Sequence, residues 1–431
     1  MRKEAIGIIN LGLMDRKIRE LKEIYHKGIK IDYPEYPTRL ASLISLLKNM
    51  NYKVRVYDGV INGWLEKEFN EIKSLTSFLK ESFGLLFIYQ KSQDLSEIEH
   101  LLSVVKYIKE NRPESEIVLI YVNAKKGFAS TVLKSLKDYL SIVVYGEIEL
   151  PLISANSNLS LEKLKLSPNT LYYHHDYIKE NPLQYSTESL LNSLLLPDFT
   201  ELELDKYLKV NNYIPITLSR GCRYRCKHCP TSEIYGNSWR SFRIEKIQKL
   251  LEEIKDKIDK NTRILVSDFD LLYNLEWFKE VCKIFKTTGY SWECRMRPDL
   301  INEKIANELS ISGCEKITFG ADVVYDYNPS LATSLDKMIT RNTLMKACSI
   351  CKTYGINVAL YVIPEFFPSM EAIFELINHC HPDSVVLSPF RNYNSLLEKP
   401  FISKEIKYFS EVLKGKNIEV TLCTGMGEGA W

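Results

Sequence analysis

The chain contains two series of short apolar segments that alternate with helical patterns, and a polar stretch separates the two series. In the first series, helical patterns such as 36–50 and 95–110 separate β-branched or aromatic segments at 5–10, 53–58, 83–89, 116–122 and 141–146. Such alternation is typical of a parallel sheet with helices on both faces. We therefore expect residues 1–155 to form a doubly wound α/β domain that binds ligands at the carboxyl ends of its strands.

The alternation stops over residues 156–210, which we expect to be a connector, and then resumes. The second series contains six strand candidates, at 214–219, 263–267, 291–295, 316–320, 357–363 and 384–388. Six strand–helix units predict a partial parallel barrel over residues 211–390, with its chemistry at the carboxyl ends of the strands. Residues 391–431 are expected to be a short C-terminal extension with one possible strand at 417–423.

Composition limits the classes of partner. The 57 basic and 55 acidic residues nearly cancel, to a net charge of +2, so the charge balance gives no argument for nucleic acid or an anionic membrane. We expect no membrane span, because no apolar run approaches the ~20 residues that one requires. The first residues show no secretory pattern, so we expect a cytoplasmic protein. There thiols stay reduced, and the ten cysteines are expected to be ligands or core residues.

Three of these cysteines stand close together in "GCRYRCKHCP", directly after the first strand candidate of the barrel. Packing of Cys222, Cys226 and Cys229 on one helix face is disfavoured by the basic residues between them. Structural zinc usually takes four ligands, and only one Cys-x-x-Cys pair occurs here. Three thiolates suit a [4Fe–4S] cluster that leaves one iron open to an external ligand. S-adenosylmethionine (SAM) could occupy that iron through its amino and carboxylate groups, although packing and zinc stay open as alternatives.

The Cys-x-x-x-Cys-x-x-Cys motif after the first barrel strand resembles that of radical SAM enzymes. Other segments resemble the class with an N-terminal cobalamin (B12)-binding-like domain: "YGEIE" (145–149), "LPDF" (196–199), "SWECRMRPDLI" (291–301), "GCEKITFGADVV" (313–324) and "LDKMITRN" (335–342). The resemblance covers most of the chain. It implies a Rossmann-like domain followed by a partial (β/α)6 TIM-like barrel. It also implies reductive cleavage of SAM to methionine and a 5′-deoxyadenosyl radical, which abstracts a substrate hydrogen.

The resemblance further implies which residues bind the cofactors. Cys222, Cys226 and Cys229 would bind the cluster. His228, just before the last cysteine of the motif, would contact SAM, as would residues at or just after the carboxyl ends of the barrel strands, namely Ser267, Asp268, Asp270, Arg295, Arg297, Gly320 and Asp322. His228 would lie near the adenine, and the group from 267 to 270 near the methionine amino group. The two arginines would contact the ribose or carboxylate, and the last two residues the adenosyl part. Helix caps for the aspartates and surface ion pairs for the arginines remain alternatives.

The N-terminal domain departs from the cobalamin pattern Asp-x-His-x-x-Gly. In "DGVING" (58–63), Asp58 and Gly63 are present, but Val60 stands where the histidine would be. A lower axial histidine at this position is therefore ruled out, although radical SAM methylases of this class often lack it. "YVNAKK" (121–126) also replaces the glycine pair that normally admits the nucleotide tail. Both cobalamin binding and a vestigial domain stay open.

The favoured function is cobalamin-dependent methylation of an unactivated carbon in a small-molecule or peptide substrate, with flavodoxin or ferredoxin as the low-potential electron donor. One alternative is a cobalamin-independent radical rearrangement, cyclisation or epimerisation, and another is a non-catalytic iron–sulfur or zinc protein. Cys348 and Cys351 lie in a helical pattern and are expected in the core. Cys423 precedes the glycine-rich end "TGMGEGAW" and is expected to be structural, with hydrogen-atom donation or ligation by a mobile thiol as the alternative.

Overall fold

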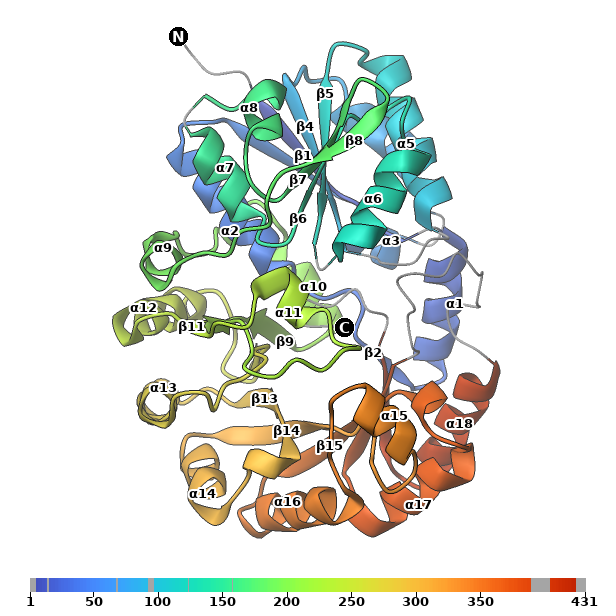
Figure 1. Ribbon diagram of the computed structural model, residues 1–431, viewed down its shortest axis with the longest axis vertical. Coiled ribbons are helices and arrows are strands. Elements are labelled where there is room, and N and C mark those ends of the chain that lie inside the picture. Colours follow the sequence, from blue (N-terminus) through green and yellow to red (C-terminus); the bar gives the residue numbers. More distant parts are fainter. Residues whose placement is uncertain are drawn as a thin grey trace.

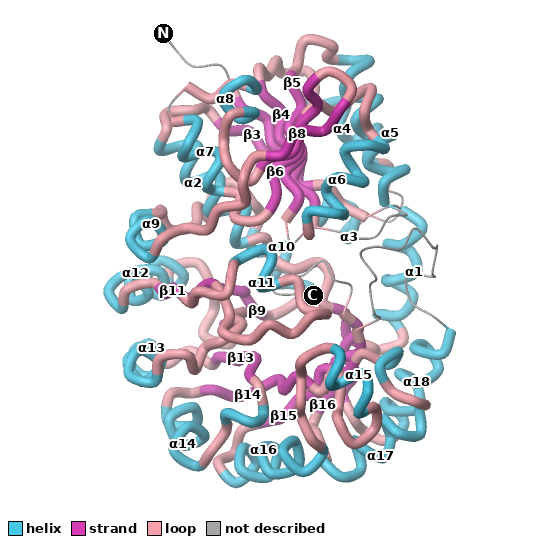
Figure 2. Tube along the Cα trace, viewed as in Figure 1, coloured by secondary structure: helices cyan, strands magenta, loops and turns pink. Residues whose placement is uncertain are grey.

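The computed structural model describes residues 5–13, 15–66, 69–91, 97–122, 124–156, 158–388 and 404–423. It is an α/β structure with two mainly parallel sheets, one near each end of the long axis (Figure 1). The N-terminal sheet lies at one end, and the second sheet curls at the other end with its helices outside (Figure 2). This arrangement confirms the predicted fold class. Among the described residues, no helix is both long and apolar enough to cross a bilayer.

The N-terminal sheet has five parallel strands and an antiparallel hairpin at one edge. Its order is β3 (Val54–Asp58), β1 (Ile6–Asn10), β4 (Leu85–Gln90), β5 (Glu116–Tyr121), β6 (Ile142–Tyr145), β7 (Thr170–His174) and β8 (Tyr177–Glu180). The central strands β1 and β4 are buried along their whole length, because helices cover both faces of the sheet. These helices are α2 (Thr38–Asn49), α3 (Gly59–Leu65), α4 (Glu71–Phe78), α5 (Glu97–Asn111), α6 (Lys126–Ser135), α7 (Glu149–Ala155) and α8 (Leu161–Lys165).

The second sheet is entirely parallel and has eight strands, two more than the six expected. Its order is β2 (Lys30–Ile31), β17 (Glu419–Leu422), β16 (Ser384–Leu387), β15 (Asn357–Val362), β14 (Cys314–Gly320), β13 (Trp292–Met296), β12 (Arg263–Val266) and β9 (Tyr213–Ile216). The helices beside it are α1 (Asp15–His26), α12 (Ile244–Lys255), α13 (Leu275–Thr288), α14 (Glu303–Ile311), α15 (Pro329–Ser334), α16 (Arg341–Thr353), α17 (Met370–Cys380) and α18 (Lys404–Gly415).

The two sheets divide the chain differently from the ranges expected from sequence. β7 and β8 extend the N-terminal sheet into the range expected to be a connector. That connector also contains α9 (Glu188–Ser193) and α10 (Leu204–Val210). β17 joins the barrel from the expected C-terminal extension, and β2 joins it from the N-terminal range. Edge pairing of this kind is decided by tertiary contact, and a two-residue strand leaves no sequence pattern.

The segment after β2 connects the two edges of the barrel sheet. Beyond β2, which pairs with β17, three contacts attach it to the β9 edge. Asn211 Nδ2 donates to the carbonyl of Pro34 (2.9 Å), and Tyr213 OH donates to Glu35 Oε1 (3.1 Å). Thr38 Oγ1 donates to the carbonyl of Pro215 (2.5 Å). The N-terminal segment therefore spans the gap between the first and last strands of the barrel.

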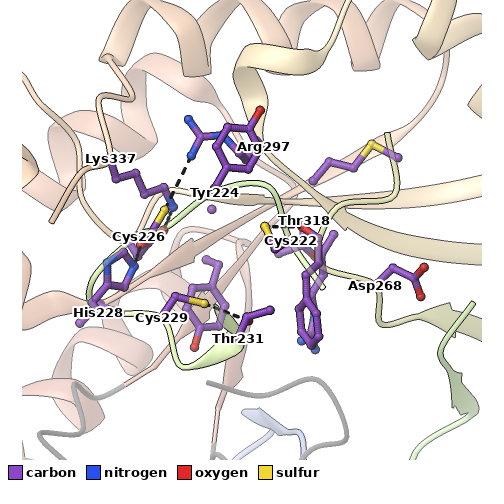
Figure 3. Close-up of a pocket in the computed structure, with 17 residues that line it drawn as sticks. Cys222, Tyr224, Cys226, His228, Cys229, Thr231, Asp268, Arg297, Thr318 and Lys337 are labelled. Carbon is purple, nitrogen blue, oxygen red and sulfur yellow. Dashed lines mark hydrogen bonds and ion pairs between the residues drawn. The ribbon is translucent and has the colours of Figure 1, made fainter. Parts of the chain in front are cut away.

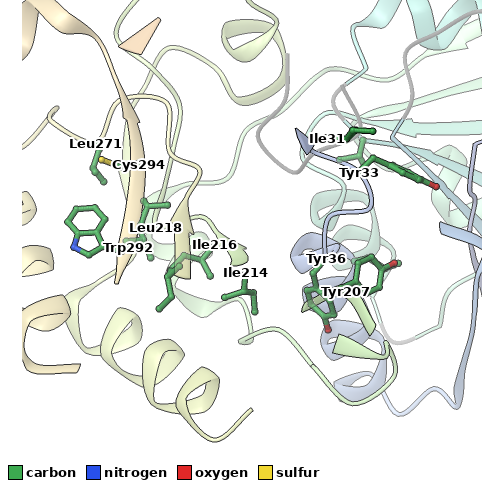
Figure 4. Close-up of a cluster of buried hydrophobic side chains, with 14 of the residues drawn as sticks. Ile31, Tyr33, Tyr36, Tyr207, Ile214, Ile216, Leu218, Leu271, Trp292 and Cys294 are labelled. Atoms are coloured by element: carbon green, nitrogen blue, oxygen red, sulfur yellow. The ribbon is translucent and has the colours of Figure 1, made fainter. Parts of the chain in front are cut away.

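An apolar cluster joins this segment to the barrel core. Figure 4 shows Ile31, Tyr33 and Tyr36 on the N-terminal segment and Ile214 and Ile216 on β9. The Tyr36 ring packs edge-to-face on Tyr207 of α10, with ring centroids 5.4 Å apart. The N-terminal segment and the connector thus share a buried aromatic contact beside the first barrel strand.

The cysteines outside the motif are buried. Cys348 and Cys351 are buried on α16, as their helical spacing predicted. Cys423 is also buried, directly after β17, and its Sγ lies 3.9 Å from Tyr361 OH. The end "TGMGEGAW" lies outside the described residues.

Candidate active site

The loop that carries the three cysteines begins at a short antiparallel pair. β10 (Ser219–Arg220) follows β9 and pairs with β11 (Arg240–Ser241), so the chain from Gly221 to Trp239 forms a closed loop. Gly221 has a φ of +84°, and a Cβ there would lie 2.2 Å from the carbonyl oxygen of Ser238. Because L side chains rarely adopt this φ and there is no space for a Cβ, only glycine fits this turn.

Residues within the loop alternate between a pocket and solvent. Cys222, Tyr224, Cys226 and His228 line the pocket, while the three basic residues between them are exposed. This period of two is that of an extended chain, in which successive side chains point to opposite sides. A turn at Cys229, whose backbone N–H donates to the carbonyl of Cys226 (3.0 Å), then brings the third thiol to the same pocket. The three cysteines therefore do not pack on one face of a helix, as the basic residues between them indicated.

The pocket lies at the carboxyl ends of the barrel strands, and its empty volume of about 1070 Å³ includes space that is open to solvent. Figure 3 shows the three sulfur atoms facing a common space, with His228, Arg297 and Lys337 around it. The lining residues are Cys222, Tyr224, Cys226, His228, Cys229, Thr231, Asp268, Phe269, Arg295, Met296, Arg297, Thr318, Gly320, Asp322, Lys337, Tyr361 and Ile363.

The environment of the thiols suits an iron–sulfur cluster better than a single ion. Burial raises the pKa of Cys222 to about 12 and also raises the pKa values of Cys226 and Cys229. The thiols would thus release their protons when a metal centre binds. Among the described residues, no three His, Cys, Asp or Glu side chains converge on a position for one metal ion. Three separated soft donors around an open space fit a cluster with one free iron.

An ion-paired group forms one side of the pocket. Asp322 follows β14, and its Oδ2 lies 2.5 Å from His228 Nε2. Its other oxygen accepts a hydrogen bond from the ammonium of Lys337. Burial alone would raise the pKa of Asp322, but Lys337 and His228 outweigh it and hold that pKa well below its usual range. The carboxylate of Asp322 therefore binds His228 and Lys337 and does not cap a helix.

The structure also brings Arg295, Arg297 and Gly320 to the pocket. Arg297 lies over the Tyr224 ring, 3.9 Å from its centroid, and its Nη1 lies 3.9 Å from Cys226 Sγ. Arg297 also forms an ion pair with Asp299 (2.9 Å). It therefore lines the pocket, as the family resemblance implies, and also forms the ion pair that was the alternative. Because a Cβ at position 320 would lie 2.9 Å from Lys337 Nζ, glycine leaves room for that ammonium.

Three candidates after β12 have different positions. Asp268 lines the pocket and accepts hydrogen bonds from the Leu218 N–H (2.7 Å) and the Ser219 hydroxyl. Asp270 instead binds the guanidinium of Arg223 with both oxygens (2.7 and 2.9 Å). Ser267 is buried, and its Oγ has no hydrogen-bond partner among the described residues. Asp268 is therefore the one of the three that lines the pocket.

Asp268 gives a pH-dependent prediction. Burial outweighs the hydrogen bonds from Ser219 and Leu218 and raises the pKa of Asp268 to about 7. An unfolded aspartate ionises near pH ~4. Between these pH values the folded state holds a proton that the unfolded state has lost, so the contribution of Asp268 to stability is present below about pH 4 and is lost as the pH rises through 7. Asp268→Asn should stabilise the protein relative to wild type more at pH 8 than at pH 5, measured by urea unfolding. An equal difference at both pH values contradicts this expectation.

Sequence reasoning missed several pocket residues, among them Lys337, which forms the buried ion pair with Asp322. It lies in "LDKMITRN", a segment that resembles the family, but no spacing pattern connects it to Asp322. Thr318 and Tyr361 also line the pocket and lie near the carboxyl ends of β14 and β15. Strand position alone could have indicated these two residues, since ligands in such barrels bind at those ends.

The N-terminal residues proposed to bind cobalamin have mainly structural contacts. Asp58 caps α3 through the Ile61 N–H and accepts hydrogen bonds from Tyr207 OH (2.8 Å) and Asn10 Nδ2 (2.8 Å). Despite these bonds, burial raises the pKa of Asp58 to about 6. At Gly63, a Cβ would lie 2.8 Å from Ile18 Cδ1, so this glycine allows close packing of α1 on α3.

The same region has no nitrogen ligand for cobalt at position 60. Val60 is buried, and its carbonyl accepts a hydrogen bond from Tyr33 OH (3.4 Å). Asn10 Oδ1, at the carboxyl end of β1, is buried without a hydrogen-bond partner among the described residues. The residues therefore do not fit a cobalamin with a histidine on cobalt. The oxygen of Asn10 is nevertheless available as a hydrogen-bond acceptor at the edge of the sheet where a ligand would bind.

The segment expected to crowd a nucleotide tail is only partly described. Asn123 lies outside the described residues, whereas Ala124 is buried in the core with Tyr121 and Phe128. The Tyr121 and Phe128 rings pack edge-to-face with centroids 5.2 Å apart. Aromatic packing thus fills the space between β5 and α6, where the usual pattern has small residues.

Comparisons with known sequences give related proteins. Residues 216–377 match the family model described as the Radical SAM superfamily. The chain is 22% identical over 327 residues to an uncharacterized methyltransferase, PH0819, from Pyrococcus horikoshii, which covers 74% of this chain and 67% of that protein. It is 24% identical over 201 residues to bacteriochlorophyllide d C-12(1)-methyltransferase from Chlorobaculum tepidum, covering 45% of this chain but only 40% of that enzyme.

Solved structures share the fold of nearly the whole chain. TsrM from Kitasatospora setae, a radical S-adenosylmethionine methyltransferase solved with cobalamin and a [4Fe–4S] cluster, gives a TM-score of 0.67 at 13% identity, over 89% of this chain and 74% of that chain. OxsB, a cobalamin-dependent S-adenosylmethionine radical enzyme, gives 0.67 at 15% identity, over 96% of this chain and 56% of that chain. At 13% and 15% sequence identity, the similarity to these two structures shows a shared fold alone.

Proposed function

We propose that this chain is a radical SAM enzyme, because residues 216–377 match the Radical SAM superfamily model, and that it is a cobalamin-dependent methyltransferase that acts on an unactivated carbon. The observation that carries the proposal is the convergence of Cys222, Cys226 and Cys229 on one pocket at the carboxyl mouth of the barrel. The N-terminal domain supports the methyl-transfer part, because its fold continues the likeness to TsrM and OxsB beyond the barrel.

The chain's own residues would bind and orient the cofactors. The three thiolates would hold a [4Fe–4S] cluster, and the pocket beside them would hold SAM. Lys337 and Arg295 place positive charge in that pocket, where the carboxylate of SAM would require it. Asp322 holds Lys337 and His228 in place. When bound, the cluster would supply the electron that cleaves SAM, and cobalamin would supply the methyl group.

Cobalamin would bind at the carboxyl edge of the N-terminal sheet, without a protein side chain on cobalt at position 60. This follows from Val60 and from the likeness to TsrM over both domains. The buried oxygen of Asn10 would be one acceptor at this edge. We propose a small-molecule or peptide substrate, and flavodoxin or ferredoxin as the electron donor.

Product analysis tests the proposal. One SAM would give up its methyl group and leave as S-adenosylhomocysteine. A second SAM would accept one electron and yield methionine and, after hydrogen abstraction, 5′-deoxyadenosine. Anaerobic protein supplied with cobalamin, SAM and a chemical reductant should show corrinoid absorption and form both nucleoside products with substrate. A protein without corrinoid bands that yields only 5′-deoxyadenosine would support the cobalamin-independent alternative instead.

A further inference from the structure

Both ends of the cysteine loop meet at one buried carboxylate of the other domain. Arg220 and Arg240 lie opposite each other in the β10–β11 pair, directly before and after the loop. Glu147 Oε2 lies 3.0 Å from Arg220 Nη1, and Glu147 Oε1 lies 2.9 Å from Arg240 Nη1. Glu147 follows β6 of the N-terminal sheet and has an exposed fraction of 0%. Each oxygen of this carboxylate therefore binds one end of the loop.

The charges show why a carboxylate is needed at this position. Like charges directly opposite each other in an antiparallel pair repel, and burial of Arg220 and Arg240 removes the screening by water. Glu149 contacts Arg220 (2.7 Å), so this arginine has two carboxylates. Arg240 otherwise donates to uncharged oxygens, including the Ser186 carbonyl (2.6 Å). Among the described residues, Glu147 is thus the carboxylate that neutralises Arg240 and joins it to Arg220.

The N-terminal domain also contacts the middle of the loop. Directly after Cys229 and Pro230, the loop forms α11 (Thr231–Tyr235). Glu233 Oε1 on this helix accepts a hydrogen bond from the Lys126 N–H (2.7 Å). Tyr185 OH, from the connector, donates to the Glu233 carbonyl (2.9 Å). These contacts are near the surface, whereas those of Glu147 are buried.

We propose that Glu147 is a positioning residue for the iron–sulfur cluster: it clamps both ends of the cysteine loop and thereby keeps the three thiols in the arrangement that retains the cluster. The reason is conformational entropy, because a loop with tied ends has fewer arrangements in which the thiols are apart. That the loop holds a cluster rests on the proposed function. The contacts of Glu147 with both arginines are present in the metal-free protein and do not depend on it.

Glu147→Gln and Glu149→Gln form a matched pair of variants. Glutamine keeps the shape but removes the charge. In E147Q, Arg240 loses its carboxylate, whereas in E149Q Arg220 keeps Glu147. Hydrogen exchange of residues 221–239 in the metal-free protein should be about tenfold faster in E147Q and within about twofold of wild type in E149Q. After anaerobic reconstitution, E147Q should also release iron to a chelator faster than wild type, and E149Q should release it at nearly the rate of wild type.

A double variant separates positioning from stability. E147Q/R240Q removes the unpaired charge and should recover the thermal midpoint of wild type, while fast exchange in the loop and fast iron release remain. If the double variant also retains iron as wild type does, Glu147 only balances charge and the inference is overturned. If E147Q fails to fold, E147D serves in its place, because its shorter side chain cannot reach both arginines.

Failure of the proposed function gives a different result. A wild-type protein that takes up no cluster overturns the radical SAM assignment, but exchange in the metal-free variants still decides whether Glu147 closes the loop. Equal exchange over residues 221–239 in E147Q, E149Q and wild type overturns the clamp, whatever the cofactor content.

Discussion

Alanine substitution of Cys222, Cys226 and Cys229 together is expected to abolish SAM cleavage and to leave a protein without iron and without the absorption of the cluster. A [4Fe–4S] cluster normally takes four cysteines, so a site with three has none to spare. Each single substitution should have nearly the same effect as the triple one, because residues that act as a unit are strongly non-additive. Iron content, the optical spectrum and 5′-deoxyadenosine formation measure the loss.

Cys282→Ala is the matched control, because Cys282 is a buried core thiol on α13 and does not line the pocket. It should keep the iron and the cleavage activity at a small cost in stability. The triple variant and wild type should unfold at similar temperatures when both are metal-free. Formation of 5′-deoxyadenosine by the triple variant would falsify the assignment of these thiols.

Asp322→Asn is expected to lower the free energy of unfolding of the metal-free protein by about 3–5 kcal/mol, the usual effect of removing one partner of a buried ion pair. The side chains of Asp322 and Lys337 are only 6% and 8% exposed. Asparagine would leave the largely buried ammonium of Lys337 without its counter-charge. SAM binding should weaken as well, because Lys337 would no longer be held at the pocket wall.

Asp299→Asn provides the comparison, since Asp299 also pairs with a pocket cation, Arg297, but is 36% exposed. Exposed pairs contribute about 0–1 kcal/mol, so urea unfolding should show little change. The double variant D322N/K337M should regain much of the lost stability, because it removes the unpaired ammonium as well. An equal loss in D322N and D299N would contradict the role given to burial.

Sequence alone predicted the chemistry of the thiols and the alternation of strands and helices. Both are local properties: three cysteines in one short loop need no distant partner to be recognised, and apolar strands buried on both faces leave a continuous pattern. For the same reason, the identity of Val60 is enough to exclude an axial histidine at that position.

Tertiary structure decided which polar side chains meet. Asp268 and Asp270 differ by two positions, yet one lines the pocket and the other binds Arg223. Lys337 reaches Asp322 across a loop, and β2 completes the barrel sheet from the opposite end of the chain. Ion pairs between distant residues have no sequence period, because their geometry is set by packing and burial. The sequence thus determined what could bind a cluster, and only the fold decided what surrounds it and, through Glu147, what closes its loop.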